Sequence, residues 1–254
     1  MKRFLGGIAL IGLVLSLGAS TAQAQTQGMP VWYSPAFGSG VGLFADFGTG
    51  LNDDAKITDS APINLGGHIL FGASVFKVWA GVWSFNPKDD LLKNPITYGG
   101  NLGVTIYKGA GSPVVVDLMA GAGYTKLSAA DAVPSTGELK TWNFPIGLPI
   151  AYGATLSGGH MIEPWIAPML QIFSDKAEGF GAGIDTSTTN LGFGVSGGIN
   201  FYSSMGLGVY VNADWSSVKR FGSTESISPF RLGAGLAWRF SVPSLPESKG
   251  FAGG

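Results

Sequence analysis

The chain has 254 residues, enough for one all-β domain or one closed barrel. Only 12% of its residues are charged and the net charge is −1, which argues against nucleic acid as a partner. Because the chain contains no cysteine, disulfides, thiolate metal sites and a lipidated N-terminal cysteine are excluded. The mean hydropathy is +0.28, yet past the N-terminus no run reaches the roughly 18 apolar residues of a membrane-spanning helix. High apolarity without such runs is typical of alternating transmembrane strands.

The first 24 residues have the three parts of a secretory signal peptide. Met1-Lys2-Arg3 is basic, Phe4 to Leu17 is almost wholly apolar, and Ala22-Gln23-Ala24 has the A-x-A form of a cleavage site. We expect cleavage after Ala24, and an uncleaved N-terminal anchor is the alternative. The remaining chain divides into a barrel domain at 25–240 and a tail at 241–254, which we expect to be disordered because it is rich in Pro, Gly and Ser.

From residue 40 onward, segments with a period of two residues are separated by turn-rich stretches. This pattern predicts β-strands. Ten strands are predicted, and eight is the alternative if two weak segments merge. The predicted strands cover residues 40–51, 62–72, 75–86, 96–107, 114–125, 142–154, 161–173, 189–202, 206–217 and 229–240.

The connections between the predicted strands alternate in length. Long polar connections lie at 52–61, 87–95, 126–141, 174–188 and 218–228. Short connections lie at 73–74, 108–113, 155–160 and 203–205. Outer-membrane barrels segregate long outer loops from short periplasmic turns in this way. The sequence therefore predicts an antiparallel, up-and-down transmembrane β-barrel in the cell outer membrane.

The two faces of the strands differ in character. In the last strand, Leu236 and Trp238 alternate with Gly235, Ala237 and Arg239. A charge that faces lipid at mid-depth costs roughly 2–4 kcal/mol, so the parity that carries charges with Gly, Asn, Ser and Thr is predicted to face a narrow lumen. The parity of Lys77 is ambiguous because tryptophans share it. The candidates for a structural polar network in the lumen are Asp46, His68, Lys77, Asp117, Glu163, Asp214, Arg231 and Arg239.

Two pairings inside this network follow from barrel closure. The first and last strands pair in a closed barrel, so Asp46 is expected near Arg231 or Arg239. His68 is expected to form a hydrogen bond with a neighbour such as Asp46.

Aromatic and proline residues mark further positions. Rings near the strand ends predict two interfacial girdles. The girdle residues are Tyr98, Tyr124, Trp142 and Trp215 at the outer rim, and Phe201, Trp238 and Phe240 at the periplasmic rim. Proline cannot donate to a ladder, so Pro145, Pro149, Pro164 and Pro168 predict bulges, a distorted seam or shorter pairing in the sixth and seventh strands.

Several segments resemble the broad bacterial family of small outer-membrane β-barrel domain proteins. They are Thr97–Gly103, Met119–Tyr124, Glu163–Pro168 and the closing run Leu232–Phe240. The resemblance covers the signal peptide and residues 38–240. It implies a Gram-negative-type envelope, contact with outer-membrane lipid and insertion by the barrel-assembly machinery, which recognises a closing strand of this kind. Because the chain continues for 14 residues past Phe240, that recognition would have to be internal.

The resemblance implies no functional residue, because the family includes adhesins, small channels, structural barrels and a few enzymes. No Asp-His dipeptide or His-x-Ser motif surrounds His68 or His160, and Gly192–Gly197 matches G-x-G-x-x-G without a βαβ unit. We therefore predict no catalytic residue, no cofactor and no metal site. The acidic pairs Asp53-Asp54 and Asp89-Asp90 are expected to be solvated loop residues, with surface cation binding as the alternative.

These observations favour a non-enzymatic, porin-like barrel with a structural, surface-interaction or minor permeability role. One alternative is a transporter of hydrophobic molecules with a lateral opening at the proline seam. Interior rings motivate this alternative, namely Phe44, Trp79, Trp83, Trp165 and Phe173. An outer-membrane hydrolase and a soluble periplasmic ligand-binding barrel are less favoured alternatives. The sequence predicts neither the ligand nor the oligomeric state.

Overall fold

The computed structural model describes residues 34, 38–49, 63–73, 75–86, 93–109, 111–128, 137–178, 186–219, 226–228 and 230–240. The predicted signal peptide, the C-terminal tail and both acidic pairs lie outside these residues. Within the described part of the chain, no helix is long and apolar enough to cross a bilayer.

The described residues form one antiparallel sheet of 13 strands, of which ten make the wall of a barrel. The ten wall strands are β1 (Ser39–Thr49), β2 (Ile63–Ala73), β3 (Phe76–Asn86), β4 (Ile96–Lys108), β5 (Val114–Ser128), β6 (Glu138–Gly147), β9 (Met161–Glu178), β10 (Thr186–Tyr202), β11 (Leu207–Lys219) and β13 (Phe230–Phe240). The shorter elements are β7 (Ile150–Tyr152), β8 (Ala154–Thr155), β12 (Ser226–Ile227) and the 3-10 helix η2 (Ser157–Gly159).

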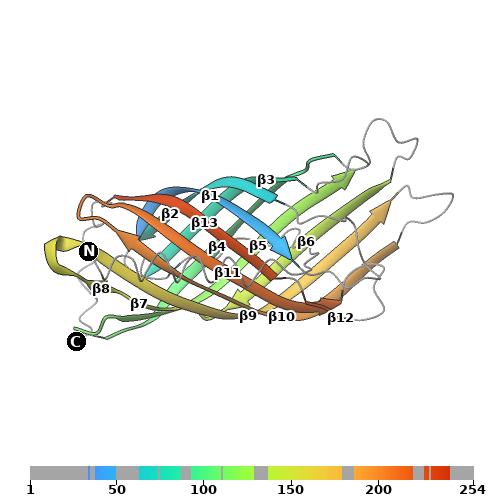
Figure 1. Cartoon of the computed structure of the whole chain (residues 1–254). Helices are drawn as coiled ribbons and strands as arrows, with labels where there is room; N and C mark the ends of the chain where they lie inside the picture. The colour runs from blue at the N-terminus through green and yellow to red at the C-terminus, as the bar shows by residue number, and fades with distance from the viewer. Residues whose placement is uncertain are drawn as a thin grey trace, which may run out of the picture.

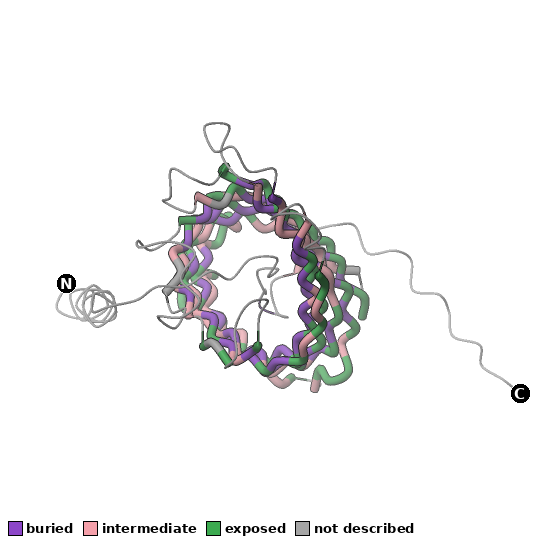
Figure 2. Tube along the Cα trace, turned by 90° about the vertical axis from the view of Figure 1, so that its right-hand side faces the viewer, coloured by how far each residue is buried: buried purple, intermediate pink, exposed green. Residues whose placement is uncertain are grey.

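The sheet closes on itself because the first strand pairs with the last. β1 pairs with β13 over its whole length, from Ser39 opposite Phe240 to Thr49 opposite Phe230. Each other wall strand pairs with its neighbours in chain order (Figure 1). Seen along its axis, the trace forms a complete ring in which buried and exposed residues alternate (Figure 2). The prediction of a closed, ten-stranded antiparallel barrel is confirmed.

Four strands extend at least three residues further than predicted at the end where the chain makes its longer connections, which we call the long-loop end. β9 has 18 residues and β10 has 17, whereas β1 has 11. β5 and β6 also continue past the predicted bounds, and these four strands project to the right in Figure 1. These terminal residues fall in the predicted long connections, because Lys, Glu, Ser and Thr are frequent among them. The opposite end is called the short-turn end.

The outer wall is apolar, whereas the inner wall carries the charged and polar side chains of the strands together with glycines and a set of buried rings. Leu43, Leu102 and Leu236 point outward and are exposed by 67%, 65% and 63%. Asp117 and Glu163 point inward and are completely buried. This inside-out distribution is the reverse of that in a water-soluble domain, where the apolar face is the buried one.

Glycines on the inner wall make room for aromatic rings. A Cβ atom at Gly42 would overlap the imidazole of His68, and one at Gly235 would overlap the phenol ring of Tyr210. The abundance of glycine, 41 residues in the chain, thus has a steric reason inside a barrel of this width.

The proline region is less distorted than predicted. β6 ends at Gly147 and β7 resumes at Ile150, but both keep one alignment with β9, since Gly147 lies opposite Met169 and Ile150 opposite Ile166. The ladder continues because proline carbonyls accept hydrogen bonds: the Leu148 amide donates to the Pro168 carbonyl over 3.0 Å.

One irregularity occurs in this region. The pairing between β5 and β6 skips the two positions between Ala120 and Gly123, which lie opposite Phe144 and Pro145. A register shift in the pairing of β4 with β5 lies outside the proline strands, between Thr105 and Tyr107. Of the three alternatives expected at the prolines, namely bulges, a distorted seam or shorter pairing, the structure shows shorter pairing at Pro145.

Candidate functional site

One group of charges lies inside the barrel toward the long-loop end. Arg231 is 1% exposed, and its Nη2 donates to Asp214 Oδ2 over 3.0 Å. The register of β11 and β13 places these two residues directly opposite each other. Arg231 Nη1 lies 3.8 Å from Asp46 Oδ2, Asn64 donates to Asp46 over 2.6 Å, and Ser196 donates to Asp214. We call these five residues the loop-side ion cluster.

A second group of charges lies inside the barrel toward the short-turn end. Lys77 Nζ on β3 reaches Asp117 Oδ2 on β5 over 2.6 Å, passing across Gly103 of the intervening β4. Arg239 Nη1 on β13 lies 2.8 Å from Glu163 Oε1 on β9, two strands that are not neighbours in the wall. We call the four charged residues the turn-side ion cluster.

Aromatic rings separate the two ion clusters. The centroid of the His68 ring lies 6.0 Å from that of Phe44, 6.2 Å from that of Trp79 and 6.2 Å from that of Tyr210. Trp83 contacts both Trp79 and Phe44, and these five residues are called the ring layer.

The order of residues along the strands places the ring layer between the clusters. Along β3, which runs toward the long-loop end, Lys77 comes before Trp79. Along β1, which runs in the same direction, Phe44 comes before Asp46. On the opposite wall, Met119, Ala151, Trp165, Ala167 and Met169 form a second buried apolar cluster. On the side formed by β1, β2, β3 and β11, the interior is thus a sequence of charged, aromatic and charged levels.

The position of His68 differs from the expectation. His68 lies opposite Gly42 in the pairing of β1 with β2, whereas Asp46 lies opposite Asn64. Four residues of strand separate Gly42 from Asp46, roughly 13 Å. The two side chains share the inner face but lie at different heights, so Asn64 is the partner of Asp46 and His68 belongs to the ring layer.

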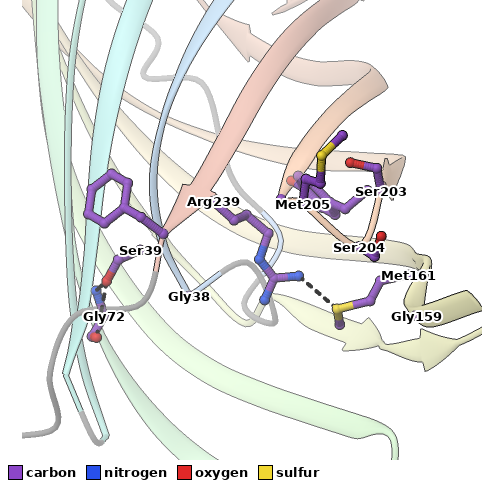
Figure 3. A pocket seen from close by; sticks show the side chains of 12 residues that line it. Gly38, Ser39, Gly72, Gly159, Met161, Ser203, Ser204, Met205 and Arg239 are labelled. Carbon is purple, nitrogen blue, oxygen red and sulfur yellow. Dashed lines mark hydrogen bonds between the residues drawn. The ribbon is translucent and has the colours of Figure 1, made fainter.

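A pocket of about 550 Å³ opens at the short-turn end, and Figure 3 shows its lining. Arg239 extends into it, donates to Met161 Sδ over 3.2 Å and lies 4.9 Å above the ring of Tyr202. Ser39 and Gly72 close one side through a hydrogen bond from the Gly72 amide to Ser39 Oγ. The pocket ends inward at the turn-side ion cluster, because Arg239 is also the partner of Glu163.

The chemistry available to these groups is limited by their partners. Four interior carboxylates each lie in an ion pair, namely Asp46, Asp117, Glu163 and Asp214. A fifth, Asp175, accepts a hydrogen bond from Thr141 Oγ1 over 2.6 Å. The rings around His68 make an apolar environment, unlike a nucleophile and base oriented by a third polar group. Within the described ranges, no three His, Cys, Asp or Glu residues are grouped closely enough to hold a metal ion.

Sequence reasoning missed a third charged group, which lies on the outer wall at the long-loop end. Lys126 Nζ lies 2.5 Å from Glu138, and Lys140 Nζ lies 3.5 Å from Glu138 and 2.5 Å from Glu178. Lys176 Nζ lies 2.5 Å from Glu178. We call these five residues the rim cluster. The signal that would have identified it is the continuation of the two-residue period in β5, β6 and β9 past the predicted strand ends.

The rim cluster lies beyond the outer aromatic residues and its charges shift one another. Hydrogen bonds from Lys140 and Lys176 lower the pKa of the Glu178 carboxyl to about 2. The hydrogen bond from Lys126 lowers the pKa of Glu138, and the hydrogen bond to Glu178 raises the pKa of Lys140. All three groups therefore stay charged over a wider pH range than in isolation.

Comparison with known proteins gives a likeness of architecture. No family model and no curated protein matches the chain. Neisserial surface protein A is 13% identical, with 80% of this chain and 97% of that chain covered and a TM-score of 0.39. The outer membrane protease OmpT from Escherichia coli is 11% identical, with 80% and 94% covered and a TM-score of 0.45. The translocator domain of the autotransporter NalP from Neisseria meningitidis is 11% identical, with 94% and 96% covered and a TM-score of 0.39.

These solved structures are bacterial outer-membrane β-barrels. Identities of 11–13% with TM-scores below 0.5 assign no function, so the function of this chain is argued from its own residues.

Proposed function

We propose that the chain is a non-enzymatic outer-membrane β-barrel whose own side chains block its lumen, and whose role is structural or one of surface interaction. The observation that carries the proposal is the combination of an apolar outer wall with a filled interior. Large apolar side chains such as Leu65, Leu191 and Leu207 are at least 57% exposed, on strands distributed around the barrel. Water would make this surface unfavourable, whereas lipid acyl chains would match it.

The interior supports a barrel without a wide pore. Six charged residues of the two ion clusters are 0–7% exposed, although they face the lumen. A charge that lined a continuous aqueous channel would be in contact with water. Here the side chains contact one another, and the ring layer adds large aromatic side chains between the two ion clusters.

Export and assembly belong to the same proposal. Cleavage after Ala24 would release the barrel domain into the periplasm, and the barrel-assembly machinery would insert it through the closing strand β13. The short turns would then face the periplasm and the long loops the outside, as in other barrels of this kind.

The test is membrane fractionation of the expressed protein, followed by gel electrophoresis with and without boiling. Recovery with the outer membrane and a band that shifts on heating are expected, because a closed barrel resists detergent until it is heated. A mature protein that is soluble in the periplasm and shows no shift would contradict the proposal.

A second candidate is a transporter of hydrophobic molecules with a lateral opening. The skipped pairing between β5 and β6 at Pro145 favours it, because a ladder without hydrogen bonds there is easier to part. Behind this point, Met119, Ala167 and Met169 form an apolar inner surface. Deletion of the gene would then slow uptake of a hydrophobic solute such as toluene, and unchanged uptake would exclude this candidate.

A further inference from the structure

Three lysines form a row across three neighbouring strands on the outer wall. Lys126 of β5 lies opposite Lys140 of β6, and Lys140 lies opposite Lys176 of β9. Their side chains are 42%, 31% and 56% exposed. The amide of Lys93 donates to the Ser128 carbonyl over 3.0 Å, which brings a fourth lysine to the edge of the row.

Among the described residues, the lysine row outnumbers its carboxylate partners. Like charges directly opposite each other on a sheet destabilise it, so such a row needs anionic partners. Such partners lie two residues closer to the strand ends, where Glu138 and Glu178 are opposite each other. Within the rim cluster itself, two carboxylates face three ammonium groups, so its five described residues carry one net positive charge. Each ammonium also has three N–H donors, more than one carboxylate contact uses.

A strip of aromatic rings adjoins the lysine row on the outer wall, two residues closer to the middle of the strands. Tyr124 lies opposite Trp142, and the centroids of their rings are 4.7 Å apart. Tyr98 extends the strip on one side, 5.3 Å from Tyr124, and Phe144 extends it beyond Trp142 at 5.9 Å. Aromatic rings of this kind prefer the boundary between acyl chains and headgroups.

The height of the row matches the headgroup layer. A transmembrane strand needs about 9–11 residues to cross the hydrocarbon, and β9 has 18. The last residues of β9 therefore project past the acyl chains. Lys140 lies two residues beyond Trp142, roughly 7 Å along the strand. Among the other strand ends described at this level, β11 presents a single lysine, Lys219.

We propose that the lysine row and the ring strip together bind a lipid of the outer leaflet that has a phosphorylated headgroup and acyl chains. The phosphate would lie against Lys126, Lys140 and Lys176, and an acyl chain would lie along Tyr124 and Trp142. This inference rests on the proposed membrane location. It assigns to one side of the barrel, formed by β4, β5, β6 and β9, the role of a lipid-binding surface.

The test uses the full-length mature protein in detergent micelles and a bisphosphorylated, acylated diglucosamine lipid as the probe. Binding is measured by native mass spectrometry and by titration of tryptophan fluorescence. The triple variant Lys126→Gln, Lys140→Gln, Lys176→Gln is expected to lose about 100-fold in affinity, since each lysine near an anionic surface contributes about fivefold and the three factors multiply.

Four matched arms make the result specific. Lys219→Gln should bind as the wild type does, and Glu138→Gln with Glu178→Gln should bind at least as tightly, because it removes the competing carboxylates. The same lipid without phosphates should bind weakly. Inorganic phosphate should not displace the lipid at millimolar concentration; displacement would identify a simple anion site and overturn the lipid assignment.

Two outcomes separate this inference from the proposed function. If the wild type reaches the outer membrane and shifts on heating, but the triple variant binds the lipid as tightly as the wild type, the lipid site is wrong and the barrel proposal stands. If the wild type is soluble in the periplasm, both proposals fail. A heat-shift assay on each variant confirms that the barrel is closed before binding is compared.

Discussion

Replacement of Arg231 by methionine would remove the cation from the centre of the loop-side ion cluster. Arg231 is 1% exposed and is the ionic partner of both Asp214, at 3.0 Å, and Asp46, at 3.8 Å. Removing one member of a buried ion pair costs about 3–5 kcal/mol, because the remaining charge stays buried without compensation. Two carboxylates lose their cation here, so we expect the upper part of that range, at least about a 1,000-fold change in the folding equilibrium.

The assay is urea unfolding of the refolded barrel in lipid vesicles, followed by the fluorescence of its seven tryptophans. Two control variants make the reasoning specific. Asp46→Asn keeps the ion pair of Arg231 with Asp214, whose net charge is zero. It should lower the free energy of unfolding by no more than about 1 kcal/mol, the typical contribution of a single hydrogen bond. The double variant Arg231→Met, Asp214→Asn should be more stable than Arg231→Met alone. Equal stability of Arg231→Met and the wild type would refute the buried ion cluster.

Three further predictions follow from other parts of the barrel. Gly235→Ala places a methyl group against the ring of Tyr210 and should destabilise the barrel by about 1–3 kcal/mol in the same unfolding assay, since overpacking has this cost; a neutral effect would contradict the described packing. Leu43→Lys introduces a charge at an outward position of β1 that is 67% exposed, and should cost about 2–4 kcal/mol in vesicles; no cost would mean that this wall does not face lipid. In the rim cluster, the lowered pKa of Glu178 means that its stabilising ion pairs persist below the ordinary value of 4.5 and are lost as the pH falls toward 2. NMR titration of its side-chain carboxyl carbon should show this midpoint, and Lys140→Gln should raise it.

The strand pattern could be predicted because each strand carries its own two-residue period. The closing strand β13 shows the clearest case, since Leu236 and Trp238 face outward while Arg231 and Arg239 face inward. The contact between Asp46 and Arg231 was also predictable, because closure makes the first and last strands neighbours.

Other features depend on geometry that no single strand contains. The pair of Arg239 with Glu163 joins strands that are not neighbours, so its prediction requires the tilt and stagger of the whole barrel. The height of His68 in the barrel was not predicted for the same reason, because the two-residue period gives the face on which a residue lies and not its level along the barrel axis. Lys77 was ambiguous because Trp79 shares its parity, and the structure places both on the inner wall.

The most direct test of a barrel blocked by its own side chains is the conductance of the purified, heat-modifiable protein in a planar lipid bilayer. The ion clusters and the ring layer predict a flat current without stable, stepwise channel openings at either polarity. Discrete and reproducible conductance steps from the folded protein would contradict the account, because ions would then be crossing the levels that the interior side chains fill.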